Sequence, residues 1–191
     1  YYGGDAGMYA ILDNSGAYGS ITNYARRGML FTNNRTTTVI QDEIAFKGVQ
    51  SCAWIAHTTA NIMLSADAKT AYLTKVVADR TEFLRVTLLS SNAKLKFKIM
   101  TCGIGEDDFI FAATKRPGWS ESHGQLAEKG RSGYKRLVIE ATNTLAFECA
   151  VVFESGYRAG DVSPVAYDYV QMSKWEVLDS YKTDSDIGGG D

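Results

Sequence analysis

Two stretches in the first third of the chain have the composition of β-strands, and they constrain the fold most strongly. Residues 36–44 begin with a β-branched run, and residues 52–59 are mostly apolar. Both compositions suit a pleated, half-buried surface. Gly48 lies in the short connection between them. We interpret the two stretches as neighbouring strands at the centre of an all-β domain, with Gly48 at the turn between them.

Strand-like runs recur along the rest of the chain, separated by turn clusters rich in Gly, Asn and Asp. Residues 95–100 alternate apolar side chains with Lys96 and Lys98. This period of two is typical of a strand with one solvent-exposed face, and the lysines are typical of a strand at the edge of a sheet. The remaining runs lie at residues 8–12, 21–32, 61–65, 71–77, 83–89, 134–141 and 145–154.

Two positions in these runs are expected to interrupt or reverse the chain. Gly28 interrupts residues 21–32, which predicts a bulge at that position. Asn143 can supply a left-handed turn residue, so residues 134–141 and 145–154 are expected to form a hairpin. The chain as a whole then contains roughly ten strands and little helix, which predicts an antiparallel β-sandwich.

The length of 191 residues suits a single domain with a sizeable core. We expect one β-sandwich domain over residues 1–183, followed by a disordered tail at residues 184–191. Ser163 and Pro164 have the pattern of a helix start. The alternation of Val165, Tyr167 and Tyr169 leaves a strand open as the alternative.

Charge, termini and cysteine count narrow the class of protein. A net charge of −2 argues against general nucleic-acid binding, and no apolar run reaches the roughly 20 residues of a membrane span. The chain begins with Tyr1 rather than Met, so we expect a processed form or a piece of a longer protein. Three cysteines without motif spacing indicate buried or free thiols rather than a disulfide framework, with one bridge left open.

A family resemblance rests on residues 8–100. Its most specific part is the pair of sequences Val-Ile-Gln-Asp-Glu-Ile at residues 39–44 and Trp-Ile-Ala-His-Thr at residues 54–58. Tyr-Gly at residues 18–19 and Arg-Arg at residues 26–27 precede them. With these sequences the chain resembles the C-terminal β-sandwich region of heparinase II/III-like polysaccharide lyases.

The resemblance implies β-elimination of acidic, uronate-containing polysaccharides by a larger protein. In the family, an N-terminal helical toroid carries the catalytic tyrosine, and a His-x-His motif supplies a catalytic histidine and a zinc ligand. This chain has two histidines, His57 and His123, and no His-x-His. We therefore expect no catalytic residue, no metal ligand and no cofactor here, with the toroid and an acidic polysaccharide as partners. A secreted, periplasmic or cytoplasmic location in a bacterium is left open.

A long polar segment, residues 115–133, is the candidate substrate-binding surface. Trp119 can stack on a sugar ring, and the cationic side chains of the segment can bind carboxylates or sulfates. The alternative is a solvated loop with the tryptophan tucked beneath it. The candidate binding residues are Arg116, Trp119, His123, Lys129 and Arg131.

Asp42, Trp54 and His57 form a second candidate group if the two central strands pair. Asp42 can then hydrogen-bond the imidazole of His57 and fix its tautomer. The alternative is a buried polar cluster whose role is to specify strand register, because buried polar groups must be satisfied whatever their use.

Three functions are open, of which the first and the third rest on the family resemblance. The first is the β-sandwich domain of a heparinase II/III-like lyase, structural or substrate-supporting and inactive alone. The second is a non-catalytic carbohydrate-binding or structural β-sandwich module. The third is a complete small lyase, which the missing catalytic motifs disfavour.

Overall fold

The computed structural model describes residues 2–4, 7–32, 36–101, 133–161 and 163–175 of the chain. These residues form nine strands and a single turn of 3-10 helix, η1 (Met172–Lys174). The predicted all-β fold is therefore confirmed. The strands are β1 (Tyr2–Gly4), β2 (Gly7–Asp13), β3 (Thr22–Thr32), β4 (Thr37–Thr58), β5 (Asn61–Leu64), β6 (Thr70–Val77), β7 (Arg80–Leu89), β8 (Phe97–Thr101) and β9 (Lys135–Ser155).

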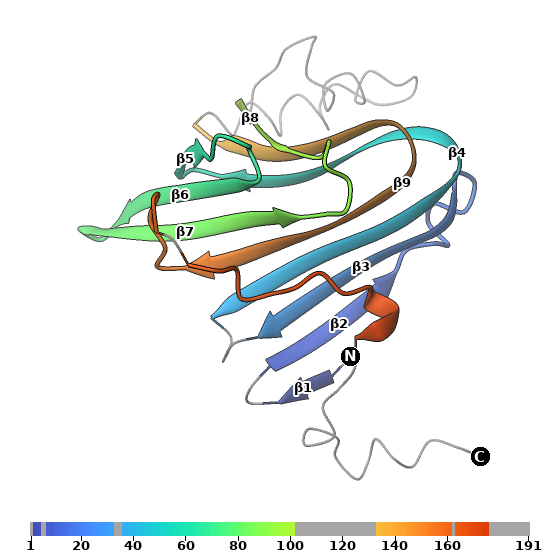
Figure 1. The fold of residues 1–191 in the computed structure, drawn as a ribbon, viewed down its shortest axis with the longest axis horizontal. Coiled ribbons are helices and arrows are strands. Elements are labelled where there is room, and N and C mark those ends of the chain that lie inside the picture. The colour runs from blue at the N-terminus through green and yellow to red at the C-terminus, as the bar shows by residue number, and fades with distance from the viewer. Residues whose placement is uncertain (1, 5–6, 33–35, 102–132, 162, 176–191) are drawn as a thin grey trace, which may run out of the picture.

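All nine strands belong to one antiparallel sheet, in the order β1-β2-β3-β4-β9-β7-β6-β5, with β8 paired to β9 off this path (Figure 1). Among the described strands β8 pairs only with β9, at an edge, as Lys96 and Lys98 predict. The described residues contain no helix long and apolar enough to cross a bilayer. Residues 184–191 lie outside the described part of the chain, as does Cys102.

The sheet folds over on itself because β4 and β9 bend together. Residues 37–45 of β4 pair with β9, the register then shifts twice, and regular pairing resumes over residues 52–58. We call this irregular zone the crease. The first layer contains β1, β2, β3, the first half of β4, the second half of β9, β7, β6 and β5. The second layer contains the second half of β4, the first half of β9, and β8.

Both predicted hairpins were wrong for the same reason. Residues 36–44 and 52–59 belong to the single strand β4, and residues 134–141 and 145–154 to the single strand β9. Asn143 does adopt the predicted left-handed conformation, with φ of 51°. The bend at Asn143 faces the bend in β4, where Gln50 is paired with Thr144. Each signal that predicts a reversal of the chain instead bends a long strand from one layer into the other.

The main hydrophobic core lies between the two layers. Trp54 from the second layer packs on Phe153 from the first, with ring centroids 6.3 Å apart. Burial of large side chains on this scale is the main source of folding free energy. The buried members of this cluster are Phe46, Trp54, Ala71, Val86, Leu88, Leu95, Phe97, Leu137, Ile139, Ala141, Phe147, Cys149 and Val151.

The segment after β9 crosses the outer face of the first layer, where Figure 1 shows it in orange and red. We call residues 163–175 the strap. Both alternatives for residues 163–172 were wrong, because the strap forms neither strand nor α-helix and contains only η1. Its backbone groups therefore need partners from the sheet beneath.

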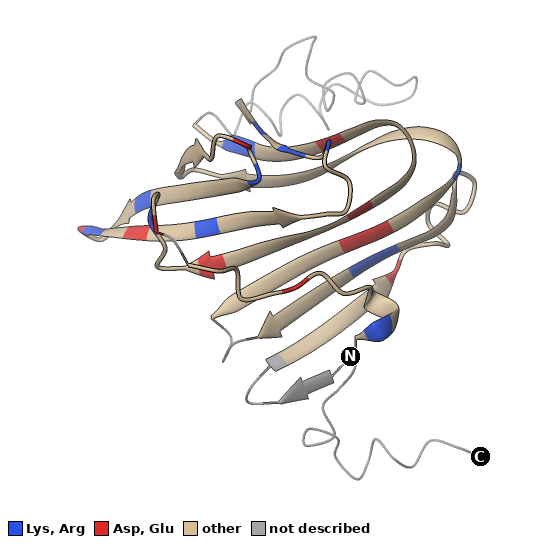
Figure 2. Cartoon of the chain, viewed as in Figure 1, with Lys and Arg blue, Asp and Glu red and all other residues tan. Residues whose placement is uncertain are grey.

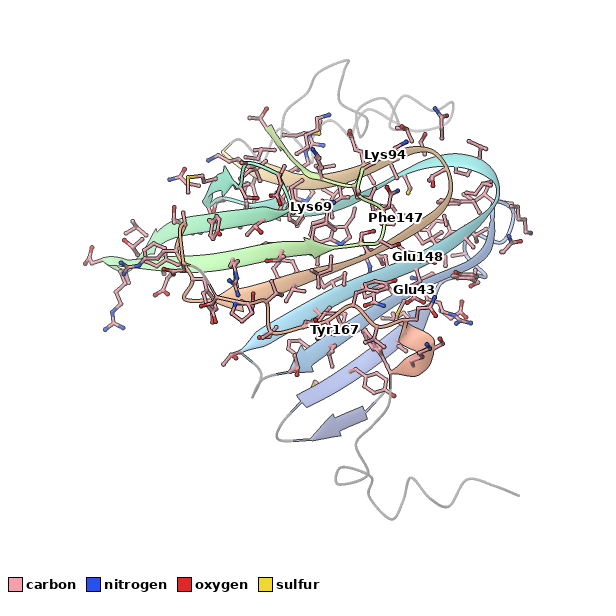
Figure 3. All side chains as sticks on the ribbon, viewed as in Figure 1. Glu43, Lys69, Lys94, Phe147, Glu148 and Tyr167 are labelled. Atoms are coloured by element: carbon pink, nitrogen blue, oxygen red, sulfur yellow. The ribbon has the colours of Figure 1, made fainter. Side chains whose placement is uncertain are left out.

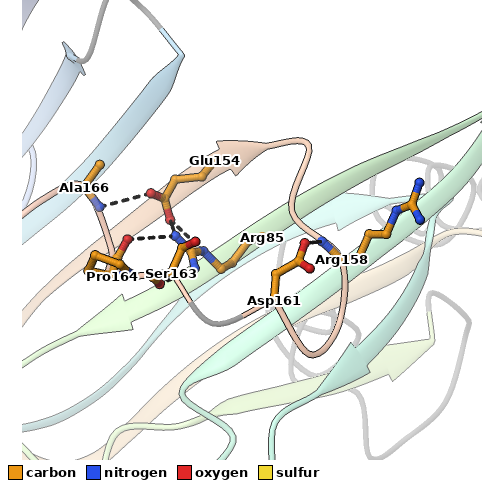
Figure 4. Close-up of polar contacts among 7 residues, drawn as sticks. All are labelled: Arg85, Glu154, Arg158, Asp161, Ser163, Pro164 and Ala166. Atoms are coloured by element: carbon orange, nitrogen blue, oxygen red, sulfur yellow. Dashed lines mark hydrogen bonds and ion pairs between the residues drawn. The ribbon is translucent and has the colours of Figure 1, made fainter.

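A buried ion pair anchors the first part of the strap. Arg85 of β7 and Glu154 of β9 are joined at 2.7 Å, with side chains 4% and 2% exposed. Arg85 also donates to the carbonyl oxygens of Ser163 and Pro164, at 2.7 and 3.2 Å, and Glu154 accepts the N–H of Ala166 at 3.0 Å (Figure 4). The pair thus replaces the hydrogen bonds that a regular strand would have supplied.

Two polar side chains of β4 anchor the middle of the strap. Gln41 Nε2 donates to the carbonyl of Val170 at 2.8 Å, and Gln41 Oε1 accepts from the Tyr167 hydroxyl at 2.9 Å. Glu43 Oε1 accepts the backbone N–H of Met172 at 2.7 Å. Glu43 and Tyr167 are labelled near one another in Figure 3.

Gly28 explains how the strap ends close to the sheet. The predicted bulge at this glycine was wrong, because Gly28 pairs regularly with Gln41; the irregularity of β3 lies between Thr22 and Tyr24. A Cβ atom at Gly28 would lie 2.5 Å from the Trp175 ring and 2.6 Å from Met172 Sδ. The glycine is therefore needed for close approach of a side chain rather than for an unusual backbone angle.

Candidate functional site

The substrate-binding residues expected from the sequence, Arg116, Trp119, His123, Lys129 and Arg131, all lie outside the described residues. The structure therefore says nothing of that segment, and these five residues stay a prediction. The site described below is built from other residues.

The structure does not bring Asp42 and His57 together. Both lie on β4, but Asp42 is in the first layer and His57 is near the end of the strand in the second. Trp54 is 4% exposed and belongs to the core, whereas His57 is exposed. The hairpin that would have paired them does not form, so the three residues do not share one polar cluster.

Asp42 instead binds Arg27 across the adjacent strands β3 and β4. Arg27 Nε and Nη2 donate to the two carboxylate oxygens, both at 2.7 Å. Asp42 is nearly buried, while the Arg27 side chain is 47% exposed. The hydrogen bond that Arg27 donates to Asp42 raises the pKa of Arg27, so the guanidinium stays charged. This two-point geometry fixes the plane of the guanidinium and leaves Nη1 outside the pair.

The Arg27–Asp42 pair faces a cleft of about 360 Å³ beside the crease. Tyr18 and Ile21 line it from the connection between β2 and β3, and Ser51 and Cys52 line it from the crease. Tyr18 is 52% exposed and so presents an aromatic ring at the rim. A fixed guanidinium, a hydroxyl and an exposed ring are groups that hydrogen-bond an anion or stack on a sugar.

Charged residues occupy neighbouring positions on β2, β3, β4 and β9 (Figure 2), where Asp13 is paired with Arg26, Arg26 with Glu43, and Glu43 with Glu148. Because side chains alternate between the two faces of a sheet, this row lies on the outer face, opposite to that of Arg27 and Asp42. Arg26 lies 3.6 Å from Asp13, and its guanidinium lies over the Tyr24 ring at 5.6 Å. The two partners of this ion pair are well exposed, so the pair contributes little to stability. In the described part of the chain, no group of three His, Cys, Asp or Glu side chains is close enough to hold a metal ion.

Two free cysteines, Cys52 of β4 and Cys149 of β9, lie in or against the main core, as the sequence predicts for thiols outside a disulfide framework. Burial raises the pKa of the Cys52 thiol from 9.0 to about 11, with the negative charge of Asp42 as a second cause. Burial also raises the pKa of Cys149. Both thiols are therefore protonated at neutral pH, and neither has the low pKa of a catalytic nucleophile.

The raised thiol pKa predicts a loss of stability in alkali. A group whose pKa is higher in the folded state stabilises it fully below the unfolded value and stops doing so as pH rises through the folded value. We therefore expect the free energy of unfolding to fall between pH 9.0 and about 11. Urea unfolding across this range measures the fall. The Cys52→Ser variant should show a smaller decline, and an equal decline would contradict the assignment to this thiol.

Comparison with known proteins finds similarity of structure only. No protein-family model and no curated protein sequence matches the chain. The heparan sulfate lyase HepC from Pedobacter heparinus has a TM-score of 0.55 at 10% identity, over 83% of this chain and 22% of that one. A mutant of that lyase has a TM-score of 0.54 at 12% identity, over 83% of this chain and 22% of the mutant. A heparinase III has a TM-score of 0.51 at 13% identity, over 83% of this chain and 21% of the heparinase. The chain therefore has the fold of a region found in heparan sulfate lyases and spans about a fifth of their length.

Proposed function

We propose that this chain is the β-sandwich part of a heparinase II/III-like polysaccharide lyase. In this role it supports the structure or holds substrate and does not itself perform β-elimination. The observation that carries the proposal is the structural match, which covers 83% of this chain but 22% of a heparan sulfate lyase. The chemistry of elimination would belong to a further domain of the larger protein, a helical toroid on the N-terminal side.

The cleft beside the crease supports a role in holding substrate. Asp42 fixes Nε and Nη2 of Arg27, whose side chain is 47% exposed, and the donor Nη1 that remains outside the pair suits a carboxylate or sulfate group. Tyr18 at the rim can stack on a sugar ring. Arg116, Trp119, His123, Lys129 and Arg131 stay candidates for the same acidic polysaccharide. A non-catalytic carbohydrate-binding module is the second candidate, favoured by this cleft alone.

Two measurements on the chain test the proposal. Incubation with heparan sulfate should give no growth of the ultraviolet absorbance that an unsaturated uronate product causes. Calorimetric titration with heparan sulfate oligosaccharides should show weak binding, reduced several-fold in Tyr18→Ala, because this substitution removes the ring on which a sugar would stack. The matched control is Tyr134→Ala, since Tyr134 is also well exposed, at 40%, but does not line the cleft.

The outcomes separate the alternatives. Growth of the absorbance would contradict a supporting role and indicate a complete lyase. Equal loss of binding in both tyrosine variants would remove the cleft from the proposal. Absence of binding by a folded protein would leave the structural role and contradict substrate support.

A further inference from the structure

The cleft beside the crease lies in the angle between the two layers. Ile44 and Phe46 line it from the first layer, and Cys52 and Ala53 line it from the second. These residues stand on the two sides of the bend in β4, where the pairing with β9 shifts twice. Because two paired strands run continuously from one layer into the other at this point, the cleft is closed on the side of the crease.

The connection between β2 and β3 forms another wall of the cleft and runs beside the bend of β4 (Figure 1). The backbone N–H of Lys47 donates to the carbonyl oxygen of Ile21 at 2.9 Å, and the Lys47 ammonium donates to the carbonyl oxygen of Gly19. This wall is therefore joined to the crease. The cleft opens to solvent on the side of Arg27 and Tyr18, whose side chains are both about half exposed.

Tyr18 is held in place on this wall by hydrogen bonds within the connection. Its carbonyl oxygen accepts the backbone N–H groups of Ile21 and Thr22, both at 2.9 Å, and the hydroxyl of Thr22 at 3.0 Å. Thr22 is buried, so this anchor is shielded from water. A rim residue that is fixed in this way loses little conformational freedom when a sugar ring stacks on it.

The cleft offers a free cationic donor to one anionic group. Arg26 and Arg27 are the cations among the described residues that line the cleft. The Arg26 guanidinium lies beside Asp13 and over the Tyr24 ring on the outer face. Arg27 remains, and Asp42 already binds its Nε and Nη2. A single carboxylate can therefore bind at Nη1, whereas a run of several anionic groups finds no second cation among these residues.

We propose that the cleft holds the end of a glycan chain, with a terminal uronate as its ligand. The inference rests on the proposed role in holding substrate and adds which part of the substrate is held. The uronate carboxylate binds Nη1 of Arg27, and the sugar ring stacks on Tyr18. A uronate inside a chain carries a sugar on each side and needs a groove with two exits, whereas this cleft is closed at the crease.

The size of the cleft agrees with a chain end. Its volume of about 360 Å³ is near the lower limit of small-ligand pockets, which span roughly 300–1,000 Å³. β-Elimination also makes ends of this kind, because cleavage at C4 of a uronate leaves an unsaturated uronate, with its carboxylate intact, at the non-reducing end of one fragment. The cleft thus fits an end that a polysaccharide lyase generates.

The number of protein molecules bound to each glycan chain is the first test. The probes are two size fractions of lyase-cut heparan sulfate, a tetrasaccharide and a chain several times longer, each with an unsaturated uronate at its non-reducing end. Calorimetric titration should give one protein molecule per chain for both probes, with equal affinity per chain. A number that rises with chain length would show binding to the interior of the chain. That result overturns this proposal and leaves substrate support intact.

Removal of the terminal uronate is the second test. An exo-acting glycuronidase converts the tetrasaccharide into a chain that ends in a hexosamine. This chain should bind about tenfold more weakly, because it lacks the carboxylate that accepts a hydrogen bond from Arg27. Equal binding of the two chains overturns the proposal. Absence of binding by every probe overturns both this proposal and substrate support, so the two failures are distinguishable.

A paired variant tests the part played by Arg27. Arg27→Gln with Asp42→Asn removes both charges together, so that neither is left without its partner. This variant, shown to be folded by circular dichroism, should bind the tetrasaccharide about tenfold more weakly and should no longer distinguish it from the chain without uronate. Arg80→Gln is the matched control, because Arg80 is exposed at the start of β7 and does not line the cleft. It should bind as the original chain does. Full binding by the paired variant overturns the proposal.

Discussion

Replacing Glu154 with alanine is expected to lower the free energy of unfolding by about 3–5 kcal/mol, the range found when one partner of a buried ion pair is removed. The variant leaves the guanidinium of Arg85, 4% exposed, with backbone carbonyls as its main partners. It also removes the acceptor for the N–H of Ala166. Urea unfolding followed by circular dichroism measures the loss.

A double variant serves as the control. Arg85→Met with Glu154→Leu removes both charges and fills similar volume, which is often neutral or stabilising for buried pairs. The double variant should regain much of the stability that Glu154→Ala loses, although the strap loses its hydrogen bonds to both side chains. A Glu154→Ala variant as stable as the original chain would contradict the view that this pair is buried and fixes the strap.

Replacing Trp54 with alanine is expected to lower the free energy of unfolding by about 3–5 kcal/mol, the range found when an aromatic side chain is truncated in a protein core. Trp54 is 4% exposed, contacts Phe153 across the two layers, and belongs to the cluster that holds them together. Chemical unfolding followed by circular dichroism measures the change without relying on the fluorescence of the missing ring.

Val49→Ala supplies the comparison for this core position. Val49 is also in β4 but is 60% exposed, within the crease, and its truncation should change the free energy of unfolding by less than about 0.5 kcal/mol. Similar losses in the two variants would mean that the layers are not held together by Trp54.

Much of the fold can be predicted from local sequence, and the crease shows where this stops. Period-two alternation and turn residues locate nearly every strand. Gly48 and Asn143 correctly mark changes of direction, but a local signal does not tell whether the chain reverses or bends. That depends on which segments lie alongside, and here β4 and β9 are each other's partners on both sides of the bend.

The candidate site was less predictable for a similar reason. The sequence predicts that Asp42 is a polar residue within a strand and needs a partner. Its partner, Arg27, lies in a preceding strand, and only the register of β3 on β4 brings the two together. The pairing of Arg85 with Glu154 depends in the same way on β7 lying beside β9, far away in the sequence. Alternation places a side chain on a face but does not identify its neighbour.

The paired bend also limits how the length of the chain can vary. Phe46, Trp54 and the other inward residues of β4 keep the same alternation across the crease, as Ile139 and Phe147 do in β9. Deleting one residue near Val49 would turn Trp54 to the outside and bring its neighbour into the interior. Insertions and deletions in this ribbon should therefore be tolerated in twos, whereas the connections at the ends of other strands can lose or gain single residues.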